Sequence, residues 1–323
     1  MKTTLSVNRL AHKLLEKLVR DSDLYGVTVQ TTESGATLID AGIEAKGGFQ
    51  AGRIITEICM GGCAKVELTS RRYGEVELLS ILVCTDYPVI ATLGSQYAGW
   101  QIKEEGYFAI GSGPARALAL KPKKIYEQIG YKDTYDKAVV ILEAEKPPPE
   151  TLTKRIASDC GVSEKSLTII ITPTTSLAGA VQISGRIVET GIHKLRRIGL
   201  DPNVILHAWG CAPIPFLDPS FDRAMARTND ALLYGGIASY TVRYHDEDEL
   251  QNLVEKAPSE ASPAHGKPFM KIFEEADHDF YKIDPNLFAP AVVMINNIET
   301  GRTFSRGRVN VDALTESFGL GRL

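Results

Sequence analysis

The stretch from Gln182 to Leu195 carries the side chains of this sequence that are best suited to acid–base chemistry. Arg186, Glu189 and His193 follow one another at spacings of three and four residues, which places them on one face of a helix. Another face carries an apolar stripe, formed by Ile187, Val188, Ile192 and Leu195. The spacing therefore predicts one helix that presents a cation, a carboxylate and an imidazole together.

Two glycines, Gly185 and Gly191, interrupt this helical pattern. A glycine inside a helix costs about 1 kcal/mol relative to alanine, so we expect the close approach of another backbone or of a ligand to require each of them. A second interpretation is a solvated helix face, on which pairs such as Arg186–Glu189 and Glu189–His193 each contribute only about 0.2–0.5 kcal/mol. Taken alone, the spacing favours this second interpretation.

The composition is that of a globular protein. Its 323 residues are enough for about two domains, and 36 basic against 40 acidic side chains give a net charge of −4. Such a charge creates no global field that would attract nucleic acid or an anionic membrane, so we expect neither as a partner. The sequence shows no secretory leader and no apolar run of about 18 residues, and we expect a cytoplasmic protein. Its five cysteines contain no CxxC pair and are expected to be buried free thiols.

The order strand, polar loop, helix recurs along the chain and predicts an α/β fold. One example is residues 107–110, which lead through Gly111, Ser112 and Gly113 into a helix that starts near Pro114. The run Pro147–Pro149 resembles a stiff linker. We therefore predict two α/β domains, residues 1–146 and 150–323, either of which can be discontinuous.

The glycine loop at residues 111–113 is a candidate anion site, because free N–H groups at a helix start attract negative charge. It lacks the third glycine of a dinucleotide-binding fingerprint, and a tight turn that binds nothing is an equally good interpretation. The six histidines form no HxH or HxxxH pair, so we expect no catalytic metal. From the residues alone, Glu189 is the best acid–base candidate.

Several longer segments resemble one known family in the same order along the chain. They read GSQYAGW, GSGPARALA, ISGRIVE and DFYKID, with the ending SFGL, and occupy residues 94–100, 111–119, 183–189, 279–284 and 317–320. Over about residues 5–320 the chain resembles the methenyltetrahydromethanopterin cyclohydrolases. The resemblance implies an enzyme without a cofactor that interconverts methenyl- and 5-formyl-tetrahydromethanopterin. It also implies a homotrimer whose subunits have two α/β domains with the pterin in the pocket between them.

The resemblance places the catalytic carboxylate of the family on Glu189 and its partner arginine on Arg186. A number of family members are expected to carry a lysine where this chain has Tyr97. This departure concerns which tail or pterin variant the protein binds, and not the chemistry of the reaction.

Further substrate-binding candidates are polar residues that interrupt small-residue loops, where a flat heterocycle can approach the backbone. They are Ser95, Gln96, Gln182 and Ser184 for the pterin ring and Ser112 and Gly113 in the glycine loop. Helix capping is the alternative role for the first four.

Two other functions remain open at this point. One is a pterin- or phosphate-binding protein without catalysis, in which Arg186 and Glu189 are structural. The other is a cyclohydrolase for a different one-carbon carrier, such as tetrahydrofolate.

Overall fold

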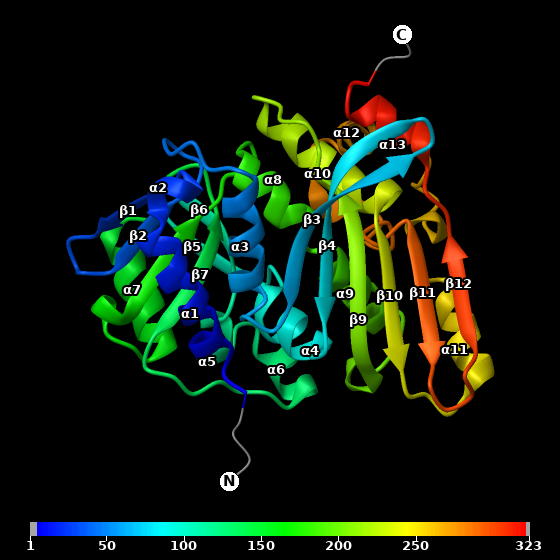
Figure 1. Cartoon of the computed structure of the whole chain (residues 1–323), viewed down its shortest axis with the longest axis horizontal. Helices are drawn as coiled ribbons and strands as arrows, with labels where there is room; N and C mark the ends of the chain where they lie inside the picture. Colours follow the sequence, from blue (N-terminus) through cyan, green and yellow to red (C-terminus); the bar gives the residue numbers. More distant parts are fainter. Residues whose placement is uncertain (1–4, 321–323) are drawn as a thin grey trace. The chain divides into compact units, whose positions relative to one another are not determined.

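The computed structural model describes residues 5–320, which divide into two compact units. The first contains the described residues up to Lys65 together with Val89–Gln182, and the second contains Val66–Pro88 and the described residues from Ile183 onward. Each unit is built on one six-stranded mixed sheet with helices, as the strand, loop and helix pattern predicted (Figure 1). Among the described residues, no helix is long and apolar enough to cross a membrane.

The sheet of the first unit has the strand order β1-β2-β8-β7-β6-β5. Its central strands β2, β8 and β7 run parallel, whereas the β1–β2, β6–β7 and β5–β6 pairs are antiparallel. The bounds are β1 Thr28–Thr31, β2 Thr37–Asp40, β5 Trp100–Glu104, β6 Tyr107–Ser112, β7 Ala138–Glu143 and β8 Leu167–Ile171. Every residue of β8 is buried, as is all of β7 except Glu143, which explains why these two strands read as nearly continuous apolar runs in the sequence.

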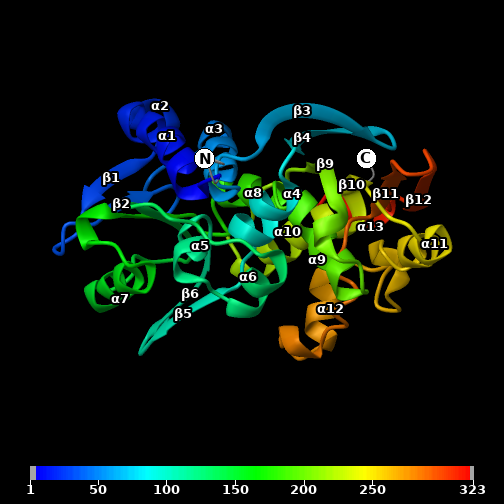
Figure 2. The ribbon, with the colours of Figure 1, turned by 90° about the horizontal axis from the view of Figure 1, so that it is seen from below.

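Helices cover both faces of the first sheet. Figure 2 shows α1 and α3 on one side and α7 on the other. The first side packs around Ile141 and Ile170, and the second around Val140 and Ile169, because successive side chains of a strand point to opposite faces. The bounds are α1 Val7–Arg20, α2 Ser22–Tyr25, α3 Phe49–Cys59, α4 Pro88–Ala91, α5 Ala115–Ala119, α6 Lys123–Ile129, α7 Glu150–Cys160 and α8 Leu177–Ser184.

The proline run at residues 147–149 is not a linker between the units. It leads from β7 into α7, which returns the chain to β8, and β7 and β8 are neighbouring parallel strands. Parallel neighbours require such a crossover, usually a helix. The division therefore does not coincide with the predicted boundary, and the chain passes between the units near residues 65, 88 and 182.

The sheet of the second unit has the order β12-β11-β10-β9-β4-β3. Strands β10 and β11 are parallel, while β9 is antiparallel to both β10 and β4, and β12 is antiparallel to β11. The bounds are β3 Lys65–Tyr73, β4 Val76–Thr85, β9 Ile205–Pro213, β10 Ile237–Val242, β11 Val292–Asn297 and β12 Thr303–Gly307. The hairpin of β3 and β4 thus joins strands that come more than a hundred residues later in the chain.

The helices of the second unit are α9 Ile187–Arg197, α10 Phe221–Gly235, α11 Glu247–Glu255, α12 Phe269–Glu275 and α13 Val311–Ser317. Helix α9 lies against β9 and β10, and α10, α12 and α13 share one apolar cluster. Inside this cluster the fully buried Asp230 accepts hydrogen bonds from the backbone N–H of Phe269 at 2.9 and 3.1 Å. Because Phe269 is the first residue of α12, Asp230 satisfies an N–H group that a helix start leaves without an intrahelical partner.

Candidate active site

The predicted continuous helix over residues 182–195 is wrong. Helix α8 ends at Ser184 and α9 begins at Ile187, with Gly185 and Arg186 in the turn that separates them. The backbone N–H of Arg186 donates to Ile183 O at 2.9 Å, and Arg186 O accepts from the N–H of Thr190 at 2.8 Å. Arg186 is therefore the N-cap of α9, and Glu189 lies in its first turn.

This break places Glu189 where a helix favours a negative charge. The unpaired N–H groups of a first turn carry the positive end of the helix dipole, which stabilises a carboxylate there. Arg186 and Glu189 are only 6% and 7% exposed, respectively. The solvated-face interpretation is therefore wrong for these two residues, because a buried carboxylate and a buried guanidinium are rarely without a structural or chemical role.

His193 differs from the other two residues of the predicted face. Burial, together with the neighbouring charges of Arg196 and Arg197, lowers the pKa of its imidazole to about 4. The imidazole is consequently neutral at neutral pH and does not provide a second cation beside Glu189.

Gly191 is explained by the close approach of Tyr240 from β10. A Cβ atom on Gly191 would lie 1.8 Å from Tyr240 Oη, and this hydroxyl donates to Val188 O at 3.0 Å. A close approach does explain the glycine, but the approaching group is a side chain and not the backbone or ligand that the sequence led us to expect. Sequence reasoning did not find Tyr240, and the helical Gly191 was the one signal that pointed to it.

Tyr240 is a neutral phenol in this environment. Complete burial raises its pKa well above the usual range, and the negative charge of Glu189 raises it further. Tyr240 therefore holds α9 against β10 next to the catalytic candidate without competing with Glu189 for protons.

Ser184, at the end of α8, is fully buried, and its hydroxyl donates to Pro213 O at 2.9 Å. This bond fixes the residue that precedes the turn to the last residue of β9. The hydroxyl proton is engaged, so the oxygen lone pairs are what Ser184 can still offer to a ligand.

In the first unit, three of the predicted substrate-binding residues lie together around Cys59. Ser95 Oγ donates to Cys59 O at 2.7 Å, and Ser112 Oγ is 3.4 Å from Cys59 Sγ. The N–H of Gly113 donates to Ser95 O at 2.9 Å. Ser95 and the equally buried Gln96 belong to a π-helical turn at Thr92–Gln96, and such turns are frequent at functional sites.

This geometry favours the tight-turn interpretation of the glycine loop. The N–H of Gly113 already has a partner in Ser95, and α5 is only five residues long. Gly113 has a φ of +92°, and a Cβ atom there would lie 2.5 Å from Ile141 Cδ1. Backbone conformation and packing thus account for this glycine.

Arg116 is a structural residue that sequence reasoning missed. Its guanidinium is fully buried and donates to the carbonyl oxygens of Lys121, Leu93 and Ser95. It also lies over the ring of Tyr97, 5.2 Å from the centroid. Arg116 therefore holds the π-helical turn that carries Ser95 and Gln96.

Gln182 is fully buried at the end of the first unit, and its Nε2 donates to Glu143 Oε1 at 3.4 Å. Ser112 pairs with Ile141 and faces the same side of the sheet as Glu143, two residues further along β7. The structure thus gathers Ser112 and Gln182 on one face of the first sheet. Ser184, Arg186 and Glu189 belong to the second unit.

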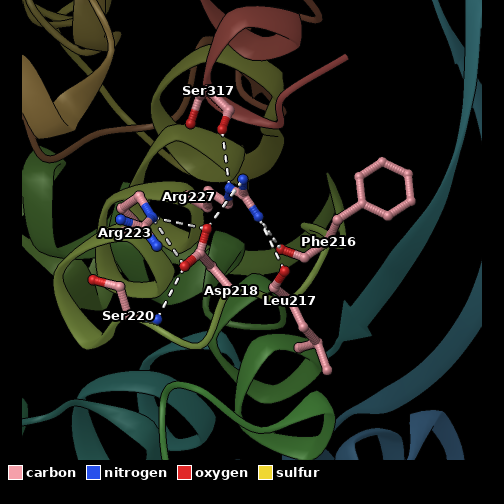
Figure 3. A network of polar contacts seen from close by, with 7 residues as sticks. All are labelled: Phe216, Leu217, Asp218, Ser220, Arg223, Arg227 and Ser317. Carbon is pink, nitrogen blue, oxygen red and sulfur yellow. Dashed lines mark hydrogen bonds and ion pairs between the residues drawn. The ribbon is translucent and has the colours of Figure 1, made fainter.

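A second group of arginines and a carboxylate, around Asp218, is structural (Figure 3). Asp218 accepts from Arg223 Nε at 3.0 Å, from the N–H of Ser220 at 3.0 Å and pairs with Arg227 at 3.2 Å. The hydrogen bond from Arg223 is the largest cause that lowers the pKa of Asp218. Arg227 also donates to the carbonyl oxygens of Phe216, Leu217 and Ser317, so the network fixes the loop before α10. Ser220 is the N-cap of that helix.

Comparison with known proteins agrees with the resemblance of the sequence motifs. Residues 6–318 match the family model described as Cyclohydrolase (MCH). The chain is 45% identical over 321 residues to the methenyltetrahydromethanopterin cyclohydrolase of Methanothermobacter marburgensis, covering 98% of this chain and 99% of the relative. It is 45% identical over 320 residues to that of Methanocella arvoryzae, covering 99% and 100%, and 44% identical over 319 residues to that of Methanocaldococcus jannaschii, covering 98% of each. With matches that span nearly its whole length, the chain belongs to the methenyltetrahydromethanopterin cyclohydrolase family.

Proposed function

We propose that this protein catalyses the reversible hydrolysis of methenyl-tetrahydromethanopterin to 5-formyl-tetrahydromethanopterin. The observation that carries the proposal is membership of the cyclohydrolase family over nearly the whole chain. It is supported by the burial of Arg186 and Glu189 at the start of α9, where a carboxylate is favoured.

Glu189 is the proposed proton shuttle. The substrate is a cation whose charge is shared by two nitrogens across one carbon, and attack by water at that carbon releases a proton. A carboxylate beside the carbon accepts this proton and also favours the cationic substrate. Glu189 then returns this proton to nitrogen 10 as the bond from the carbon to nitrogen 10 breaks, and the hydroxyl of the adduct loses its own proton to solvent as the formyl C=O forms. Such a role is typically worth about 100- to 10,000-fold in rate. The methenyl carbon is already electrophilic, so the step requires no cofactor.

Arg186 is proposed to orient this carboxylate. A guanidinium presents several donors in a planar fork that matches the two oxygens of a carboxylate. As the N-cap of α9, Arg186 lies three residues before Glu189, so the same turn fixes the backbone of both residues. Tyr240 supports the arrangement from β10 through its bond to Val188 O.

The residues proposed to bind the pterin ring are Ser95, Gln96, Gln182 and Ser184, and Ser112 and Gly113 of the glycine loop are the further proposed substrate-binding residues. The hydroxyls of Ser95 and Ser184 donate to backbone carbonyls, so towards a pterin they would act as acceptors. The resemblance also implies a pocket between two domains and a homotrimer, and the sequence suggests a cytoplasmic location; all three stay predictions. Light scattering coupled to size-exclusion chromatography measures the molecular mass of the assembly, which decides the oligomeric state.

The decisive experiment mixes purified protein with the methenyl pterin and follows the loss of its near-ultraviolet absorption. We expect acceleration, and a strong preference over methenyl-tetrahydrofolate. Binding without acceleration would support a passive pterin-binding protein. Faster turnover of the folate cation would support a cyclohydrolase for that carrier.

A further inference from the structure

The carboxyl ends of β7 and β8 place two polar side chains next to each other. Leu142 pairs with Ile171 in the parallel ladder, and the N–H of Thr172 donates to Leu142 O at 3.0 Å. Glu143 is the last residue of β7 and Thr172 directly follows the last residue of β8, so the two lie side by side and point to the same face of the sheet. In parallel sheets, ligands bind at this carboxyl end of the strands.

Thr172 lacks a hydrogen-bond partner there. Its side chain is fully buried, and its Oγ1 makes no hydrogen bond to any of the described residues. Buried polar groups in native proteins nearly always have a partner, so a ligand or an ordered water is expected to supply the missing one.

Glu143 is half-buried beside Thr172, and its Oε1 accepts from Gln182 Nε2 at 3.4 Å. Within residues 5–320, no lysine or arginine forms an ion pair with this carboxylate. A carboxylate presents two acceptor oxygens, and those of Glu143 are not saturated by a cation. This face of the first sheet therefore combines the two acceptor oxygens of Glu143, the amide of Gln182 and the hydroxyl of Thr172, which needs a partner.

We propose that Glu143 is a specificity-determining residue that, together with Gln182 and Thr172, binds the pyrimidine edge of the pterin. The inference rests on the proposed function for the identity of the ligand. A pterin carries two adjacent donors, its N3–H and 2-amino groups, and a carboxylate can accept from both at once. The Thr172 hydroxyl donates to the neighbouring 4-oxo group, and Gln182 orients the carboxylate.

The chain offers a matched control in Glu145. It lies two residues beyond Glu143, is exposed, and accepts from Thr175 Oγ1 at 3.3 Å. Replacing either glutamate by glutamine removes the same charge from nearly the same place. The two variants therefore separate recognition of the pterin edge from a general electrostatic effect on the cationic substrate.

The test compares Glu143→Gln and Glu145→Gln with the wild type in steady-state hydrolysis of the methenyl pterin. Hydrogen bonds to a charged group contribute strongly to the binding free energy. Because Glu143→Gln removes them, we expect its KM to rise about 10- to 100-fold. We expect kcat to change only a few-fold, because the lost contacts form equally in the ground state and the transition state. Glu145→Gln should keep both constants. Thr172→Val should raise KM about 3- to 10-fold without lowering the melting temperature, because it removes a hydroxyl that has no partner in the unliganded protein.

Calorimetric binding of tetrahydromethanopterin provides a readout that does not depend on turnover. A wild type that binds this pterin without hydrolysing its methenyl form would remove the proposed function, while weaker binding by Glu143→Gln alone would still support the role of Glu143. Equal KM and equal affinity of Glu143→Gln, Glu145→Gln and the wild type would overturn the inference and leave the proposed function standing. A wild type that does not bind the pterin would overturn both.

Discussion

Replacing Gly191 by alanine tests how α9 is held beside the catalytic candidate. The added methyl group would lie 1.8 Å from Tyr240 Oη, 2.9 Å from Tyr240 Cζ and 3.1 Å from Pro290 Cγ. The tyrosine must shift, which breaks its bond to Val188 O. Overpacking costs about 1–3 kcal/mol and the lost bond about 0.5–1.5, while alanine returns about 1 kcal/mol of helix propensity. We expect a net loss of about 0.5–3.5 kcal/mol in the free energy of unfolding.

Urea unfolding measures this loss, and Tyr240→Phe provides the matched control. Alone, Tyr240→Phe should cost about 0.5–1.5 kcal/mol, because it removes the hydrogen bond but not the ring. In the double variant the closest clash is absent, so its cost should be at least about 0.5 kcal/mol smaller than the sum of the single costs. Turnover should fall in Gly191→Ala because the movement of α9 displaces Glu189. A Gly191→Ala protein as stable as the wild type, or strictly additive single costs, would refute this account.

Three further predictions concern charged groups of the second unit. Glu189→Gln should lower kcat about 100-fold or more with a smaller change in KM while the fold survives, because the amide cannot accept the proton; near-normal turnover would make Glu189 a structural carboxylate. Arg186→Lys keeps the charge but loses the planar fork, so kcat should fall while the pH dependence that arises from Glu189 remains, and a fully active variant would argue against an orienting role. Burial raises the pKa of Asp230 from 3.8 to about 8, so between about pH 4 and pH 8 the folded protein binds a proton that the unfolded chain does not, and stability falls as the pH rises through this window. Asp230→Asn should flatten that part of the stability profile in urea unfolding at pH 5 and pH 8, and an unchanged profile would contradict the assignment.

Much of the secondary structure was predictable because local signals were strong. The bounds of α7 follow from local signals, since proline precedes the helix and glycine follows it. Strands β7 and β8 stand out in the sequence as apolar runs. The sequence signal of β3 is weak because the strand has few apolar residues and contains two adjacent arginines, and that of α3 is weak because glycines surround its start.

The candidate site was predictable only in part, because its geometry depends on contacts between distant segments. The sequence singled out Glu189 and Arg186 but predicted a continuous helix, since periodicity does not reveal that the chain turns at Gly185 and Arg186. Tyr240 comes from a strand about fifty residues away, and only tertiary packing brings it to Gly191. Glu143 and Thr172 become neighbours through the register of two parallel strands, which no single segment encodes.

The insertion of β3 and β4 into the sheet of the second unit also constrains how the chain is made. At synthesis rates of about 5–20 residues per second, β9, the partner of β4, emerges roughly 120 residues and about 6–24 s after that strand. During this interval the hairpin has an unpaired edge, which invites pairing with other chains. Slower translation of residues 85–205 should therefore lower the yield of native protein. Coexpressed chaperones that shield strand edges should restore this yield.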